Sequence, residues 1–209
     1  MNKEEISKFL QYFENKKERT IVVIDYGNVD KWKEDLNWNV DIQYLGNLIK
    51  YLSINNKKLR RFYYGEDCGP NEKHPKITEW SKSVLERAEM NKFEVVKKRV
   101  KYIHDNKNNK MEKKCDLDVE MAVDLIKEKE NYDYIILFSG DGDLMYVIKY
   151  LFENFNKKCF VFAARDHIAR EIIDGIEDGF VESLQYVNDY EYRLNKNRLN
   201  NKKYFRKWF

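Results

Sequence analysis

The sequence is poor in the residues that mark several protein classes. Only two prolines and eight glycines occur among 209 residues, which excludes collagen-like proteins and Gly/Pro-rich linkers. The three cysteines, Cys68, Cys115 and Cys159, are odd in number and far apart. They predict reduced thiols in a cytoplasmic protein, with neither a disulfide framework nor a zinc site. Because long apolar runs are also missing, we expect no membrane span and no secretory signal.

Aromatic and charged residues are abundant instead. Apolar residues make up 43% of the chain and aromatic residues 15%, enough to form a core, which argues against wholesale disorder. The formal net charge is only +3, but residues 188–209 contain seven basic and two acidic side chains, whereas the rest is slightly acidic. We therefore expect a domain over residues 1–187 and a basic, aromatic tail over residues 188–209.

Two hydrophobic periods alternate along the domain. Apolar, β-branched runs predict strands, and apolar residues at intervals of three and four predict helices. Strands are predicted over 21–24, 59–64, 93–100, 134–138 and 159–163, and helices over 6–13, 42–52, 78–91, 117–130, 144–152 and 166–174. This alternation predicts an α/β fold with a central, mainly parallel sheet and helices on both faces.

Acidic residues follow the two most apolar strands. Asp25 comes directly after residues 21–24, and Asp141 and Asp143 follow residues 134–138 in the sequence Ser-Gly-Asp-Gly-Asp. If these strands are central neighbours, their carboxyl ends meet where ligands bind in open α/β sheets. A single Asp at such a place is usually a helix cap or turn former. The combination of three aspartates at neighbouring strand ends favours a functional site instead.

A fourth acid interrupts the apolar side of a predicted helix. Asp118 lies in the middle of a stripe formed by Leu117, Met121, Ala122, Leu125 and Ile126. A carboxylate there needs a cation, a strong donor or a cavity, although a residue in the first turn alternatively caps its own helix. We expect Asp118 to join the other three acids. Asp116, Glu120 and Asp124 lie on the opposite side or at the margin of the stripe and are additional candidates.

Four carboxylates at one point require a divalent cation. No histidine or cysteine pair accompanies them, so an oxygen-only site for Mg²⁺ or Mn²⁺ is predicted. Such a site suits phosphodiester hydrolysis by metal-activated water; a covalent role for Ser139 stays open. Basic residues near the site and in the tail are candidates for binding RNA. The basic segment near the site is alternatively a solvated loop, and the tail is alternatively a helix packed on the domain or on a partner. The RNA-binding candidates are Lys107, Lys110, Lys113, Lys114, Arg198, Lys202, Lys203 and Arg206.

These motifs resemble the NYN domains of the PIN-like ribonuclease superfamily, including the LabA-like proteins. The resemblance covers residues 20–184, and it rests on three motifs in order: Asp25 with Asn28, Lys-Cys-Asp-Leu-Asp-Val-Glu-Met over 114–121, and Ser-Gly-Asp-Gly-Asp-Leu over 139–144. Cys115, Asp116 and Leu144 depart from the residues usual there. The resemblance implies a PIN-like Rossmannoid fold and a Mg²⁺- or Mn²⁺-dependent ribonuclease, with endonuclease action favoured. It also implies that Asp25, Asp118, Asp141 and Asp143 bind the metal and that Asn28 orients the first of them.

Two other functions remain open from the sequence. A haloacid-dehalogenase-type phosphatase also places Asp at strand ends, but it needs a second acid two residues after the first, which is missing after Asp25. A noncatalytic module that binds RNA or protein would keep the same fold, and retention of all four acids argues against it. The tail also allows a homodimer or another protein partner.

Overall fold

A six-stranded parallel sheet forms the centre of the protein. The computed structural model describes residues 1–15, 19–53, 59–70, 75–105 and 110–199. Across the sheet, the strands follow the order β3 (Glu94–Arg99), β2 (Arg60–Glu66), β1 (Thr20–Asp25), β6 (Tyr134–Phe138), β7 (Lys158–Ala163) and β8 (Val181–Tyr186). Every neighbouring pair is parallel. The α/β fold with a parallel central sheet is therefore confirmed.

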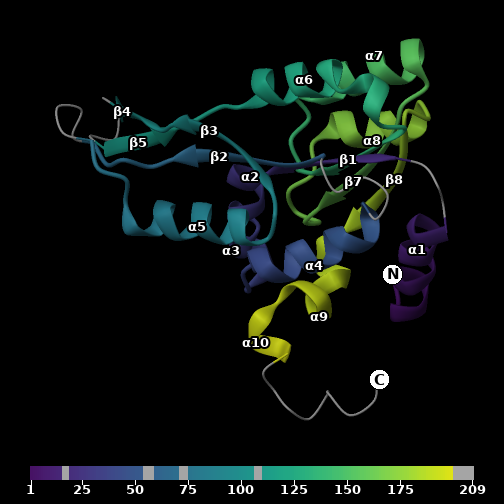
Figure 1. Ribbon diagram of the computed structural model, residues 1–209, viewed down its shortest axis with the longest axis horizontal. Coiled ribbons are helices and arrows are strands. Elements are labelled where there is room, and N and C mark those ends of the chain that lie inside the picture. Colours follow the sequence, from purple (N-terminus) through teal and green to yellow (C-terminus); the bar gives the residue numbers. More distant parts are fainter. Residues whose placement is uncertain (16–18, 54–58, 71–74, 106–109, 200–209) are drawn as a thin grey trace.

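Helices cover both faces of this sheet, as Figure 1 shows. On one face lie α1 (Lys3–Asn15), α4 (Ile42–Leu52), α5 (Glu79–Met90) and α9 (Glu191–Leu194). On the other face lie α6 (Asp118–Lys127), α7 (Met145–Phe155) and α8 (Arg170–Glu177). The side chains of Asp41 and Thr78 cap the starts of α4 and α5 by accepting hydrogen bonds from backbone N–H groups of their first turns.

Strands β1 and β6 are central neighbours, as predicted. They pair from Thr20 with Tyr134 to Ile24 with Phe138, and Ile21 to Ile24 are completely buried. Helices on both faces explain why these strands are apolar throughout rather than alternating. The chain runs outward from β1 through β2 to β3 and from β6 through β7 to β8. The topological switch point thus lies between β1 and β6.

Several elements differ from the sequence-based expectations. In the basic segment after β3, for which a solvated loop was one interpretation, β4 (Lys101–Asp105) and β5 (Lys110–Lys114) pair as an antiparallel hairpin. Short helices α2 (Tyr26–Lys31) and α3 (Lys33–Leu36), and strand β8, were not expected. The helix predicted over 166–174 begins only at Arg170. The helix predicted over 117–130 is α6 followed by the 3₁₀ turn η1 (Lys129–Asn131).

The first part of the C-terminal segment packs on the sheet. It forms the 3₁₀ turn η2 (Val187–Tyr190), α9 and α10 (Lys196–Leu199). Tyr190 and Leu194 are completely buried, and Tyr190 donates a 2.7 Å hydrogen bond to Gln185. Lys202, Lys203 and Arg206 lie outside the described residues, as does the side chain of Arg198. A domain boundary at residue 187 stays a prediction.

Candidate metal centre

Two connections meet at the switch point between β1 and β6: the direct junction of β1 with α2, and the loop that follows β6. Asp25 ends β1, and residues 139–143 follow β6 directly. Ser139 bridges the two connections: its Oγ donates a 3.2 Å hydrogen bond to Asp25 Oδ2 and accepts a 3.1 Å hydrogen bond from the backbone N–H of Asp141. Asp25 and Asp141 are therefore held in one network by a residue that the sequence presented only as a possible nucleophile.

Asn28, in the first turn of α2, also connects the two segments. Its backbone N–H donates to Asp25 Oδ1 at 3.2 Å, so Asp25 also caps α2. Its side-chain Oδ1 accepts hydrogen bonds of 2.9 Å from the backbone N–H of Gly140 and from Trp32 Nε1. Trp32 is completely buried. Sequence reasoning missed Trp32, because its role depends on a contact that only the folded α2–α3 segment creates.

The glycines of the loop after β6 lie in close packing, and at Gly140 the neighbouring atom is backbone. A Cβ atom at Gly140 would collide with the carbonyl oxygen of His167, and Gly140 O accepts a 2.8 Å hydrogen bond from Ala169 N. A Cβ atom at Gly142 would lie 2.6 Å from Glu171 Oε2. The loop thus lies against the connection between β7 and α8. Glu171 brings to this loop a carboxylate that no sequence motif indicated.

Asp118 reaches the site from the start of α6. Its backbone N–H donates a 3.0 Å hydrogen bond to Asp116 Oδ1. Leu117, the N-cap residue of α6, makes no capping hydrogen bond with its side chain. The capping contact at this helix start therefore comes from Asp116, whose carboxyl group also shares a side-chain hydrogen bond with that of Asp118. Burial raises the pKa of Asp118 to about 7, and the side-chain hydrogen bond with Asp116 and the negative charges of Asp116, Asp141 and Asp25 add to this effect.

The pKa of Asp25 is also raised. Burial is the main cause, and the charge of Asp141 adds to it. Hydrogen bonds from Asn28 and Ser139 and the positive charge of Lys31 oppose this effect. The charge of Asp141 therefore acts on both Asp25 and Asp118, and the charge of Asp25 acts on Asp118, although the three residues come from separate parts of the chain.

The remaining acidic candidates have other surroundings. Asp143 is exposed, as Asp141 is, and its backbone N–H donates a 3.2 Å hydrogen bond to Asp141 Oδ1. Glu120 forms a 2.8 Å ion pair with Lys98, and Asp124 accepts a 2.8 Å hydrogen bond from the hydroxyl of Tyr63. The structure thus groups Asp25, Asp118 and Asp141, with Asp116 beside them and Asp143 on the adjoining loop.

The chemistry of this group fits a hard divalent cation. All donors are oxygen atoms, as Mg²⁺ and Mn²⁺ prefer, and mutual repulsion among the acids leaves negative charge to be neutralised. Within the described ranges, no three His, Cys, Asp or Glu side chains already lie close enough to hold one ion together. Binding would therefore require the carboxylates to turn toward a common point on a backbone frame that is already fixed.

The predicted RNA-binding lysines differ in their contacts. Lys113 forms a 2.7 Å ion pair with Asp67. Lys114 is exposed, and its charge helps to lower the pKa of Asp116, after the larger effect of the hydrogen bond from the backbone of Asp118. Lys107 lies outside the described residues, and only the backbone pairing of Lys110 with Asp105 is described.

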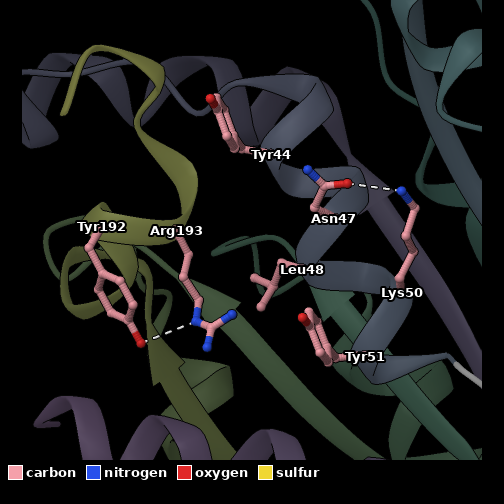
Figure 2. Close-up of a pocket in the computed structure, with 7 residues that line it drawn as sticks. All are labelled: Tyr44, Asn47, Leu48, Lys50, Tyr51, Tyr192 and Arg193. Carbon is pink, nitrogen blue, oxygen red and sulfur yellow. Dashed lines mark hydrogen bonds between the residues drawn. The ribbon is translucent and has the colours of Figure 1, made fainter. Parts of the chain in front are cut away.

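A separate cavity of about 480 Å³ lies between α4 and α9 (Figure 2). It is lined by Tyr44, Asn47, Leu48, Lys50, Tyr51, Tyr192 and Arg193. The guanidinium group of Arg193 lies 5.6 Å from the ring centre of Tyr51 and 5.4 Å from that of Tyr192. No acid of the candidate metal centre lines this cavity.

Comparison with known proteins agrees with the motifs and the fold. Residues 19–184 match the NYN domain family. The chain belongs to this family. Part of it is 40% identical over 60 residues to the low amplitude and bright protein LabA of Synechococcus elongatus, a match that spans 28% of this chain and 32% of LabA.

The crystal structure of VPA0982 from Vibrio parahaemolyticus, titled a protein of unknown function, has the same fold. It superposes with a TM-score of 0.61 at 20% identity, over 87% of this chain and 98% of that one. This likeness shows the fold alone, whereas the match of residues 19–184 confirms the predicted membership of the NYN family, which is grouped with PIN-like nucleases. Across the described residues, every helix falls short of the length or apolarity that a membrane crossing requires.

Proposed function

We propose that this NYN domain is a Mg²⁺- or Mn²⁺-dependent ribonuclease. The observation that carries the proposal is the grouping of Asp25, Asp118 and Asp141 at the switch point, each presented by a different element. Burial and the nearby acidic charges raise the pKa values of Asp25 and Asp118, and among the described residues neither these two carboxylates nor Asp141 has an ion pair with arginine or lysine. Such a group of acids is costly unless it serves binding or catalysis.

The residues have distinct roles in this proposal. Asp25, Asp118 and Asp141 hold the cation, and Asp143 completes its surroundings from the adjoining loop. When bound, the cation lowers the pKa of a water molecule and neutralises charge on the phosphate. Asn28 and Ser139 are positioning residues, because their hydrogen bonds hold the start of α2 and the loop after β6 against each other. This preorganisation limits the rearrangement needed to reach the productive geometry.

RNA is the proposed substrate, since lysines of the β4–β5 hairpin adjoin the acids and a phosphate backbone binds such side chains. We place the activity in the cytoplasm, because Cys68, Cys115 and Cys159 are free thiols. A noncatalytic RNA- or protein-binding module is the alternative, and it predicts RNA binding without metal-dependent cleavage.

Circular and linear forms of one single-stranded RNA test this proposal. Incubation with Mn²⁺ or Mg²⁺ should cleave both forms, since an endonuclease needs no free end, and excess EDTA should stop the reaction. Full cleavage in excess EDTA would contradict the metal-dependent mechanism. Cleavage of the linear form alone would limit the enzyme to exonuclease action. Binding of RNA without any cleavage would support the noncatalytic module.

A further inference from the structure

The β4–β5 hairpin presents two lysines directly opposite each other. In the antiparallel register, Lys101 pairs with Lys114, and Tyr102 with Lys113. Side chains of directly opposed residues lie on the same side of the hairpin, with Cβ atoms about 4.5–5.5 Å apart. Two like charges at such a pair destabilise the hairpin. Both lysines are exposed, and neither has an ion-pair partner in the described part of the chain.

The opposite side of the hairpin is fixed to the body of the protein. Tyr102 Oη and Lys113 Nζ donate hydrogen bonds of 2.6 and 2.7 Å to the two carboxylate oxygens of Asp67. Asp67 also accepts a 2.8 Å hydrogen bond from Gly69 N, and its own N–H donates to Ser81 Oγ at 2.9 Å. Successive strand residues point to opposite faces, so Lys101 and Lys114 project from the face that Asp67 does not occupy.

This free face adjoins the candidate metal centre. Lys114 ends β5 only two residues before Asp116, and Asp116 accepts the hydrogen bond from Asp118 N. Lys98, near the end of β3, ties the same region together by donating to the carbonyl oxygen of Asp116 at 2.9 Å while pairing with Glu120. Within its described part, the chain thus holds two opposed positive charges without an ion-pair partner next to the acidic group.

From this arrangement we infer that Lys101 and Lys114 together bind a backbone phosphate of the nucleic-acid strand that enters the candidate metal centre. The inference rests on the proposed function and adds a phosphate subsite to it. A bound phosphate would neutralise the repulsion between the two lysines, which accounts for a pair that is unfavourable on its own. Lys113, in contrast, positions the hairpin through Asp67.

The test uses the full chain and the variant Lys101→Gln/Lys114→Gln. Binding of a fluorescent single-stranded RNA in EDTA, measured over a range of salt concentrations, should weaken for this variant at every salt concentration. The slope of log affinity against log salt should fall by about 0.7 for each phosphate that the variant no longer neutralises. In Mn²⁺, KM for RNA cleavage should rise roughly tenfold with kcat unchanged, as expected when ground-state and transition-state binding weaken equally.

Two matched variants separate a phosphate site from general effects of charge. Lys149→Gln/Lys158→Gln removes the same charge from lysines that pair with Asp178 and Glu182, and its affinity and slope should match the wild type. Lys101→Arg/Lys114→Arg keeps both charges and should retain affinity.

The outcomes separate this inference from the proposed function. An unchanged salt slope and KM for Lys101→Gln/Lys114→Gln, in a wild type that cleaves RNA, would overturn the phosphate subsite alone. A wild type that neither binds nor cleaves RNA would overturn the proposed function as well. If Lys101→Gln/Lys114→Gln lost the wild type's binding to phosphatidylserine vesicles but bound RNA as the wild type does, the lysine pair would be assigned to a membrane surface and the inference overturned.

Discussion

The loops of the candidate metal centre and the β4–β5 hairpin lie at the same edge of the sheet but are held in different ways. The loops follow buried central strands and are joined by Ser139, Asn28 and the fully buried Trp32. The hairpin follows an edge strand and is fixed largely through one carboxylate, that of Asp67. A catalytic site needs the rigidity of the frame after the central strands, whereas a surface that binds a flexible nucleic-acid strand tolerates a hairpin held by fewer contacts.

Asp118→Asn should have the largest effect on activity. The variant keeps the shape of the side chain but removes a charge that contributes to cation binding, so metal-dependent cleavage should fall by about 10²-fold or more. The free energy of unfolding without metal should hold or rise slightly, because repulsion from Asp116, Asp141 and Asp25 is relieved. Cleavage rates and thermal melting measure the two effects.

Glu120→Gln is the matched control for this variant, since Glu120 lies in the same helix turn but pairs with Lys98. It should retain cleavage. Equal activity of the two variants would remove Asp118 from the site. Loss of activity in Glu120→Gln alone would mean that the metal ligand lies on the face of α6 that carries Glu120.

Gly140→Ala should have the largest effect on the stability of the loop frame. The added methyl group collides with backbone rather than with a side chain that rotates away, so we expect the free energy of unfolding to fall by about 3 kcal/mol. Urea denaturation measures the change. Gly27→Ala is the control: its Cβ would lie at an ordinary 3.4 Å from Asp25 Oδ1, and stability should hold or rise. A tolerated Gly140→Ala would show that the loop is less constrained than described.

Trp32→Phe should destabilise the protein less, by about 2 kcal/mol, because it removes the hydrogen bond to Asn28 and leaves unfilled space in the core. Trp80→Phe is the control, since Trp80 is 60% exposed and should cost below about 0.5 kcal/mol. Chemical denaturation of both variants gives the comparison. Equal costs would contradict a special role for Trp32.

Asp67→Asn should act on the hairpin alone. Burial pushes the pKa of Asp67 upward, but hydrogen bonds from Lys113, Tyr102 and Gly69 outweigh it and hold that pKa below its usual range. Backbone amides of β4 and β5 should exchange with solvent about tenfold faster in the variant, with little change in the central strands. Because the folded pKa is lowered, the stabilisation from Asp67 is present above about pH 4 and is lost as pH falls below it. Unchanged exchange would show that other contacts hold the hairpin.

The same contrast explains how much the sequence predicted. The β-branched runs of β1 and β6 predicted the central strands, and helical spacing placed Asp118 on the core side of α6, because burial leaves a periodic pattern. The hairpin has no such pattern, since its strands are exposed and rich in lysine. Strand β8 was missed for a related reason: it is an edge strand that contains Glu182, Ser183 and Gln185.

Contacts between segments far apart in the chain could not be predicted from the sequence patterns. The expected start of α8 was wrong because Ala169 donates to the carbonyl oxygen of Gly140 before the helix begins. The bond between Trp32 and Asn28, the position of Glu171 beside Gly142 and the anchoring of Lys113 by Asp67 likewise depend on tertiary packing. Membership of the NYN family and the fold were predicted correctly; the metal ligands stay a prediction.

Anomalous diffraction from crystals of the wild-type protein soaked in Mn²⁺ tests the central claim most directly. A single strong peak is expected between the carboxylates of Asp25, Asp118 and Asp141, and it should be absent from Asp118→Asn crystals soaked in the same way. A peak that persists in Asp118→Asn, a peak bound elsewhere, or no peak under conditions in which the protein cleaves RNA would contradict the assignment of these aspartates as the metal ligands.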